Sequence, residues 1–276
     1  MPPRPPDPSA SGGTHLFLEA LGVVDLPPRT SAFDPGYDAA TVIAHLEQSG
    51  RLLSRLKLSM ATWLLADEKA TQRKIDAAHR LGVPLVTGGG PFEIAQARGC
   101  LDDFMALCAR LGIDRIEAGE GFTPPGVPEA IMQRAERYGL EVQVELGEKH
   151  AGVFDRSVLD QLTERGRRWL AAGAKQIVVE GRESAQGIGL FDETGKLNVS
   201  FAEHFLTAWG PERTVFEAPT KRSQFDFLTH FGPLVNLSNV RLEEIHRVEI
   251  YRRGLHADSY DRELAPRSRP KAEIPQ

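Results

Sequence analysis

Charged and amide side chains recur at the points where short apolar segments of this chain end. A strand buried on both faces of a parallel sheet is normally a plain apolar run, so a charge at its end needs a partner or a ligand. When successive strands end in this way, we expect the ends to line one shared pocket, as in an enzyme. The segments concerned are Arg55–Ser59, Arg115–Glu117, Val142–Glu145, Val178–Glu183, Val215–Glu217 and Val235–Asn236.

The segment 140–146 alternates polar and aliphatic residues, which puts Glu145 on one face with Gln143 and Glu141. In a barrel the aliphatic face would meet the helices and the polar face the lumen. Glu145 would then lie nearest the open end, with Lys149 in the loop that follows. One interpretation is a carboxylate metal ligand beside a lysine acid. The other is a structural Glu–Lys pair inside the barrel.

The next such segment ends in Glu180-Gly-Arg182-Glu183. Glu180 and Arg182 share parity, so both are expected to point inward, whereas Glu183 begins the loop. A planar guanidinium suits bidentate binding of a carboxylate, phosphate or sulfonate. The alternative interpretation is a structural salt-bridge turn.

Three more segments are candidates for binding an anion. In many barrels the loops after strands seven and eight bind phosphate, which favours Lys221, Ser223 and the backbone near Asn239. Gly88 and Gly89 would let a ligand approach backbone N–H groups. The alternatives are a solvated basic loop at Lys221 and glycines that only turn the chain.

Composition and missing motifs exclude several classes of protein. The 276 residues carry a formal charge of −5, which gives no basic field for nucleic acid. No apolar run approaches the roughly 20 residues of a membrane span, and the proline-rich start lacks the apolar centre of a secretory signal. The two cysteines form no disulfide framework, so we expect a cytoplasmic protein. Zinc spacing, a nucleophile elbow, a Walker loop and a nicotinamide fingerprint are all missing.

Eight short apolar segments alternate with amphipathic ones, which predicts a parallel sheet with crossover helices. Eight units in about 250 residues favour a single (β/α)₈ TIM barrel over residues 14–260, between disordered proline-bearing tails at 1–13 and 261–276. A doubly wound open sheet is the alternative. Active sites of TIM barrels lie at the carboxyl ends of the strands, where the charged residues fall. We expect strands at 30–33, 55–59, 83–87, 114–118, 141–146, 175–180, 213–217 and 234–237.

From about Phe17 to Tyr260 the chain resembles the phosphosulfolactate synthases. These (β/α)₈ barrels add sulfite to phosphoenolpyruvate with magnesium, in a route to coenzyme M. The resemblance rests on several segments in order and at the right spacing. They are Val178–Ser184, Val215–Pro219 with Lys221, Val235–Asn239, Glu145–Gly147 with Lys149, Gly88-Gly89 with Phe92-Glu93, and Arg252–Leu255 with Asp258.

The resemblance implies a carbon–sulfur bond-forming lyase that gives 3-phosphosulfolactate. It implies that the Mg²⁺ ligands include Glu145, Glu183 and Glu217, and that Lys149 protonates the intermediate. Lys57 and Arg182 would hold the anionic substrates, and Lys221 the phosphate. Further contacts to substrate would come from Ser223, Asn236, Asn239, Gly88 and Gly89. Barrels of this kind often assemble, so we expect a homo-oligomer with small anionic substrates, and with neither nucleic acid nor membrane as partner.

Four departures from the family pattern bear on the substrate. Asp34-Pro35-Gly36 replaces Asp-Lys-Gly, and Ser59-Met60-Ala61 replaces Gly-Trp-Gly. Glu120 replaces an aspartate and His256 an arginine. Two cations are thereby lost, which favours a second hypothesis: a diverged enzyme with the same metal and enediolate chemistry but another nucleophile or acceptor. A catalytically silent relative with a binding or protective role is the third; the retained Glu145 argues against it.

Overall fold

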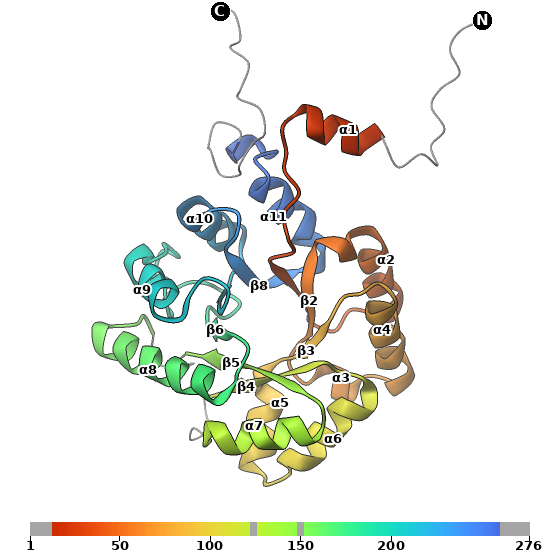
Figure 1. Cartoon of the computed structure of the whole chain (residues 1–276), viewed down its shortest axis with the longest axis vertical. Coiled ribbons are helices and arrows are strands. Elements are labelled where there is room, and N and C mark those ends of the chain that lie inside the picture. The colour runs from red at the N-terminus through yellow and green to blue at the C-terminus, as the bar shows by residue number, and fades with distance from the viewer. Residues whose placement is uncertain (1–12, 122–125, 148–151, 260–276) are drawn as a thin grey trace, which may run out of the picture.

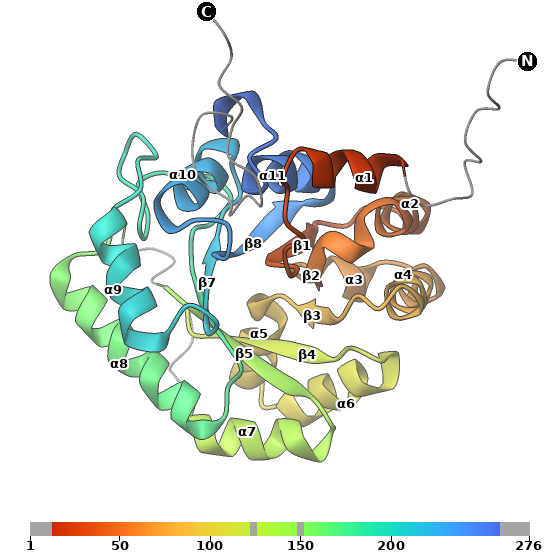
Figure 2. The ribbon, with the colours of Figure 1, turned by 45° about the horizontal axis from the view of Figure 1, so that its top comes forward.

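The strands close into a barrel in which each strand pairs in parallel with its neighbours in chain order. The computed structural model describes residues 13–121, 126–147 and 152–259. The order β1 to β8 is sequential, and β8 pairs with β1 (Figures 1 and 2). A single (β/α)₈ TIM barrel is therefore confirmed, and the doubly wound sheet is excluded. The strands are β1 Thr30–Asp34, β2 Leu53–Leu58, β3 Leu85–Thr87, β4 Arg115–Gly119, β5 Glu141–Leu146, β6 Ile177–Val179, β7 Thr214–Glu217 and β8 Asn236–Arg241.

Helices connect successive strands and form the outer ring of the barrel (Figure 2). Aspartate or asparagine side chains cap the starts of several of them, and Gly112 and Gly173, both with a left-handed backbone, end α6 and α8. No helix within the described ranges is long and apolar enough to cross a membrane. The helices are α1 Gly13–Ala20, α2 Ala39–Ser49, α3 Thr62–Leu65, α4 Glu68–Arg80, α5 Gly89–Ala97, α6 Leu101–Leu111, α7 Pro128–Arg137, α8 Arg156–Ala172, α9 Val199–Trp209, α10 Lys221–Phe231 and α11 Ile245–Arg252, with the 3₁₀ turns η1 Gly50–Leu52, η2 Leu242–Glu244 and η3 Ala257–Ser259.

The two predicted tails fall almost wholly outside the described residues, so their predicted disorder stays a prediction. Only Gly13, at the inner edge of the first tail, is described, and it begins α1.

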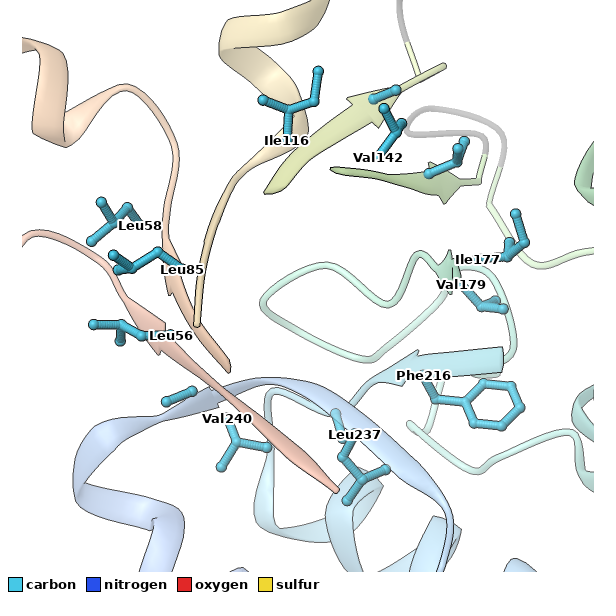
Figure 3. Packing of buried hydrophobic residues seen from close by; sticks show 14 of the residues in the cluster. Leu56, Leu58, Leu85, Ile116, Val142, Ile177, Val179, Phe216, Leu237 and Val240 are labelled. Atoms are coloured by element: carbon cyan, nitrogen blue, oxygen red, sulfur yellow. The ribbon is translucent and has the colours of Figure 1, made fainter. Parts of the chain in front are cut away.

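The apolar core lies between the strands and the helices rather than on the barrel axis. Aliphatic and aromatic side chains of the strands face outward in Figure 3, and all of those labelled are buried. Each such side chain contributes about 1.5–3 kcal/mol by leaving water. The alternate residues point into the lumen and are largely polar, among them Arg55, Lys57, Arg115, Glu117, Gln143 and Glu145. The lumen therefore has to be held together by hydrogen bonds and ion pairs.

Strand β8 begins later than the sequence predicts. We expected it at 234–237, with Asn236 near its carboxyl end, but it spans Asn236–Arg241 and Asn236 begins it. Asparagine and serine have low strand propensity, so Ser238 and Asn239 read as a loop that follows the strand in the sequence. In the fold both belong to the last strand, and Ser238 is buried. This shift moves Asn236 to the opposite end of the lumen.

A buried arginine on α11 joins the first and last strands of the barrel. Arg252 has no exposed surface. Its guanidinium donates to Thr30 Oγ1 of β1 at 3.0 Å and to the carbonyl of Val235, just before β8, at 3.0 Å. Glu249 Oε1 accepts from Arg252 Nε at 3.1 Å and from the Thr30 hydroxyl at 2.6 Å. The closure of the barrel thus depends on one internal ion pair.

We expect Arg252→Met to lower the free energy of unfolding by about 1–3 kcal/mol, because it leaves Glu249 Oε1 and the Val235 carbonyl without this buried donor, while Arg253 still pairs with Glu249 Oε2. Urea denaturation followed by circular dichroism measures the change. The matched control is Arg222→Met, since Arg222 is a half-exposed side chain paired with Asp226, and its loss should cost less than about 1 kcal/mol. Equal losses in the two variants would contradict a special role for Arg252.

Candidate active site

A cavity of about 830 Å³ opens at the carboxyl ends of the strands. It lies where the sequence places the active site of this fold. Its lining comes from β1, β2, β5 and β7 and from the segments after β2, β3, β6 and β8. The lining residues are Phe33, Lys57, Ser59–Ala61, Gly88–Pro91, Ile94, Glu145, Glu180, Arg182–Ser184, Gln186–Ile188, Glu217 and Asn239.

Lys57 lies at the inner end of this cavity and is surrounded by three glutamates. Its Nζ is 2.7 Å from Glu117 Oε1, 3.4 Å from Glu217 Oε1 and 3.6 Å from Glu145 Oε2. The four side chains come from β2, β4, β5 and β7, and Lys57 is only 3% exposed. One ammonium therefore meets carboxylates from three other strands inside the lumen. We call these four residues the Lys57 cluster.

The electrostatics of the Lys57 cluster favour a permanent charge on the lysine. Burial alone would lower the pKa of Lys57, but the charges of Glu117, Glu217 and Glu145 raise it well above its usual range. Burial also raises the pKa of Glu117 to about 8, against the opposing effect of Lys57. The pKa of Glu217 is raised for the same reason. A single ammonium cannot neutralise three carboxylates, so the cluster holds a carboxyl proton near neutral pH.

Backbone N–H groups fix the orientation of two of the glutamates. Glu117 Oε1 accepts from the N–H of Gly89 at 3.0 Å, at the start of α5. Glu217 Oε2 accepts from the N–H groups of Gly181 and Arg182, at 2.9 and 3.2 Å. Arg182 has a left-handed backbone with φ of 52°. A non-glycine residue in that conformation is strained. The hydrogen bonds that the two N–H groups donate to Glu217 hold the backbone of Arg182 in this conformation.

Glycines at the strand ends leave the room that the glutamates need. A Cβ on Gly147 would lie 2.2 Å from the Cβ of Glu180, and one on Gly119 would lie 2.4 Å from Glu93 Oε1. Neither distance is physically possible, so a side chain at either position would displace a glutamate. The glycine in the Glu145-Leu-Gly147 segment is thus explained, because Glu180, just after β6, lies too close to leave room for a side chain at position 147.

Most of the predicted site residues come together around this cavity. Lys57, Glu145, Glu217, Arg182, Glu183, Gly88, Gly89 and Asn239 all line it. Asn239 has a buried Oδ1 that accepts no hydrogen bond from the described residues, so it offers an acceptor to a ligand. Lys149, the predicted acid, lies outside the described residues.

Three predicted substrate contacts lie elsewhere. Lys221 begins α10, where its Nζ is 3.4 Å from Asp258 Oδ2. Ser223 is buried and forms a capping box with Thr220. Asn236 donates from Nδ2 to the carbonyls of Pro211 and Thr214, at 2.8 and 3.1 Å, at the amino end of the barrel. Each of these side chains has a local structural partner, and none of the three lines the cavity.

Of the four departures from the family pattern, Met60 lies at the cavity, and it also has a left-handed φ of 52°. Pro35, Glu120 and His256 do not line the cavity. Glu120 points toward α8, where Trp169 Nε1 donates to it at 2.9 Å and Arg165 forms an ion pair with it. His256 lies against the rings of Phe225 and Tyr251. The change in the cavity wall is therefore concentrated after β2.

Glu117 and Glu180 stand at expected strand ends, but the residue pattern indicated no catalytic or binding role for either of them, although both lie at the site. Glu117 is fully buried in the Lys57 cluster, and Glu180 lines the cavity. The signal for Glu117 was its position in the Arg115-Ile-Glu117 segment, two residues after an inward arginine. A charge at that depth of a strand needs a partner. Lys57 also points into the lumen and could have been identified as that partner.

The cavity can hold a hard divalent cation only together with an anionic ligand. Among the described residues, no three His, Cys, Asp or Glu side chains form a ready-made metal site. Glutamates 145, 180 and 183 nevertheless present carboxylates to the cavity, and Mg²⁺ is usually held by one or two carboxylates plus water and substrate oxygens. The donor set thus fits magnesium in that shared form. Glu217 is less available, because protein donors engage both of its oxygens.

Comparison with known proteins points to one family. The profile described as (2R)-phospho-3-sulfolactate synthase (ComA) matches residues 28–258. The phosphosulfolactate synthase of Methanocaldococcus jannaschii is 30% identical over 233 residues, covering 84% of this chain and 93% of that protein. That of Methanothermobacter thermautotrophicus is 29% identical over 232 residues, covering 83% and 90%. The solved 3-dehydroquinate dehydratase of Enterococcus faecalis has a TM-score of 0.51 at 12% identity, covering 82% of this chain and 94% of that one, a likeness of fold alone.

We expect the stability of the protein to fall between about pH 5 and pH 8 because of Glu117. Its pKa is raised from 4.5 to about 8 in the folded state, so the folded protein binds a proton that the unfolded chain has released. That stabilisation is complete below the pKa that Glu117 has in the unfolded chain, and it is lost as pH rises through the pKa of the folded state. The free energy of unfolding then falls by up to about 1.4 kcal/mol per pH unit. Urea denaturation of wild type and Glu117→Gln across this range tests it, and the variant should show the flatter profile.

Glu141→Gln is the matched control for this pH dependence. Glu141 lies on β5, and hydrogen bonding and charge from Arg115 outweigh burial and lower its pKa. The contribution of Glu141 to stability is lost only as pH falls through that lowered pKa. The variant should therefore shift the plot of unfolding free energy against pH without changing its slope between pH 5 and pH 8. Parallel profiles for wild type and Glu117→Gln would contradict the raised pKa of Glu117.

Proposed function

The chain belongs to the (2R)-phospho-3-sulfolactate synthase family, and from that premise we propose that it catalyses the magnesium-dependent addition of sulfite to phosphoenolpyruvate, giving 3-phosphosulfolactate. The observation that carries the proposal is the Lys57 cluster at the inner end of a cavity that also contains Arg182. A permanently charged lysine and a guanidinium suit two anionic substrates, and the surrounding carboxylates suit the cation that those substrates bring.

The substrates would be held by groups from three sides of the cavity. Arg182 offers planar donors for a carboxylate, phosphate or sulfonate. The backbone at Gly88–Gly90 opens α5 and lines the cavity, so a phosphate there would meet the positive end of a helix. Asn239 offers its amide from β8. Magnesium, when bound at Glu145 and Glu183, would supply electrostatic stabilisation of charge on the substrate carboxylate.

The reaction forms one bond to sulfur and one to hydrogen. The sulfur lone pair of sulfite attacks the methylene carbon of phosphoenolpyruvate. The electrons of the C=C bond move toward the carboxylate, giving an enediolate-like intermediate. A proton then adds to C2, and the phosphate ester remains intact. Negative charge develops on the carboxylate during the first step, so fixed positive charge placed there lowers the barrier most.

Because Lys57 stays charged, we infer that it acts on the substrate by electrostatics and that another group donates the proton to C2. A lysine whose pKa lies far above neutrality keeps its proton, and efficient general acids have a pKa near the working pH. We therefore propose Lys149, which follows β5 in the sequence, as the group that protonates C2. Glu117 and Glu217 would act as positioning residues, because they hold Lys57 in place.

A second candidate function is the same chemistry with a different acceptor or nucleophile. The observation that favours it is the apolar rim of the cavity, where Met60, Ala61, Pro91, Ile94 and Ile188 gather. Met60 and Ile94 are about half exposed there, at 46% and 52%. Phosphoenolpyruvate and sulfite offer no apolar group to such a rim, whereas a substrate with a hydrocarbon part would.

Phosphorus NMR of the protein with phosphoenolpyruvate, sulfite and Mg²⁺ tests the proposal. We expect a new phosphate-ester resonance that requires both sulfite and metal. Unchanged phosphoenolpyruvate in a folded sample with Mg²⁺ would reject the first function. Chemically related acceptors with a hydrocarbon group would then be tried against sulfite and against other nucleophiles.

We expect Lys149→Met to abolish turnover while phosphoenolpyruvate still binds, because the variant removes the proton donor and leaves the Lys57 cluster intact. Turnover is followed by the same NMR assay and binding by titration calorimetry. Lys175→Met is the matched control, since Lys175 is half exposed and pairs with Glu141 at the far end of β5; its activity should equal that of wild type. Normal turnover in Lys149→Met would remove Lys149 from the mechanism.

A further inference from the structure

A second cavity, of about 400 Å³, opens at the amino ends of the strands, opposite the active-site cavity. We call it the lower cavity. Its lining includes two arginines and several amide and hydroxyl groups, but no aspartate or glutamate among the described residues. An opening into a barrel lumen that carries only positive and neutral polar groups is suited to an anion. The polar residues that line it are Arg29, Ser31, Ser54, Arg55, Gln143, Gln176, Asn236 and Ser238.

Three hydrogen-bond donors in this lower cavity have no acceptor within the described residues. They are the Nε of Arg29, the Nε of Arg55 and the hydroxyl of Ser238, and all three atoms are buried. Ser238 as a whole is only 2% exposed. A buried donor without an acceptor costs about 1–3 kcal/mol, so three of them around one cavity need an explanation. A ligand with several acceptor oxygens supplies one.

The charge of Arg55 points in the same direction. It forms no ion pair with any residue that the structure describes, and its Nη1 donates to the neutral amide of Gln176 at 2.9 Å. Burial and then the nearby charge of Arg115 lower the pKa of Arg55 to about 10. The carboxylates at this end are already engaged, Glu212 by Arg29 and Glu141 by Arg115. Arg55 is thus a partly buried cation that forms no direct ion pair among the described residues, and Glu141 and Asp114 act on its charge only from a longer distance.

We propose that the lower cavity binds a small oxyanion between Arg29, Arg55 and Ser238. The shared chemistry is that of a tetrahedral or planar group with several acceptor oxygens, as in sulfate, inorganic phosphate or the phosphate of a small phosphomonoester. Guanidinium groups recognise such oxygens through charge-assisted hydrogen bonds. The site is separate from the proposed reaction at the other end of the lumen and does not depend on it.

Binding at the lower cavity would affect the active site through one chain of hydrogen bonds. Gln143 lines the lower cavity, and its Oε1 accepts from Arg115 Nη1 at 3.4 Å. Its Nε2 donates to Glu117 Oε2 at 2.8 Å, and Glu117 holds Lys57. A single side chain, that of Gln143, therefore separates the lower cavity from Glu117 of the Lys57 cluster.

We expect sulfate to raise the melting temperature more than chloride does at equal ionic strength, and titration calorimetry to give the dissociation constant. Arg182→Met removes the guanidinium of the active-site cavity, so sulfate binding that persists in this variant does not depend on that guanidinium. In that background, Arg55→Met should weaken sulfate binding about tenfold or more, because one charge-assisted hydrogen bond is lost. The matched control is Arg51→Met, an exposed arginine in η1, which should bind sulfate as before.

Ser238→Ala keeps the test decisive if Arg55→Met does not fold, since it removes one donor without changing the charge and should weaken sulfate binding several-fold. Parallel titrations with inorganic phosphate and glycerol 3-phosphate distinguish a free ion from a phosphomonoester; tighter binding of either supports the site. Equal effects of sulfate and chloride, or unchanged binding in both Arg55→Met and Ser238→Ala, would overturn the proposal.

Discussion

The ion cluster of Lys57 with Glu117, Glu145 and Glu217 is the interaction on which the rest of the active end depends. Its four members come from four different strands, so the lysine joins opposite walls of the lumen. Taking these charges out of water is costly, and three carboxylates on one ammonium leave an excess of negative charge. The cluster is therefore poor as a device for stability alone. It places an ammonium at the inner end of the cavity, and under the proposed function that ammonium would meet an anionic substrate.

The lumen as a whole departs from the usual interior of this fold. Many (β/α)₈ barrels fill the lumen with layers of branched aliphatic residues, whereas here the aliphatic residues face the helices and the lumen carries arginines, glutamates and amides. Charge is also divided along the axis, with glutamates in excess at the carboxyl end and arginines at the amino end. Gln143 lies between the two and hydrogen-bonds to Glu117, with Arg115 on its other side. The same alternation of strand residues thus produces two cavities with opposite electrostatic character.

Much of this arrangement could be predicted from the sequence, and the failures have physical causes. Strand parity placed Glu145 on the lumen face, because period-two alternation is imposed by the backbone itself, and the charges at the strand ends pointed to the cavity that Lys57 and Arg182 line. Asn236 was assigned to the wrong end, since polar residues hid the true start of β8. Ser223 looked like a phosphate ligand but caps its own helix with Thr220, and local caps cannot be told from ligand contacts by residue type. Glu117 received no role because its partner lies 60 residues away in sequence and meets it only when the barrel closes.

The charge state of Lys57 links the geometry of the cavity to the proposed reaction with anionic substrates. Nitrogen-15 NMR of lysine side chains, with Lys57→Met to assign the resonance, measures that charge directly. The account predicts an ammonium signal for Lys57 that persists unchanged to at least pH 10 and shifts when phosphoenolpyruvate and Mg²⁺ are added. A lysine that titrates at or below its ordinary pKa of about 10.4, or one whose signal ignores the substrate, would contradict it.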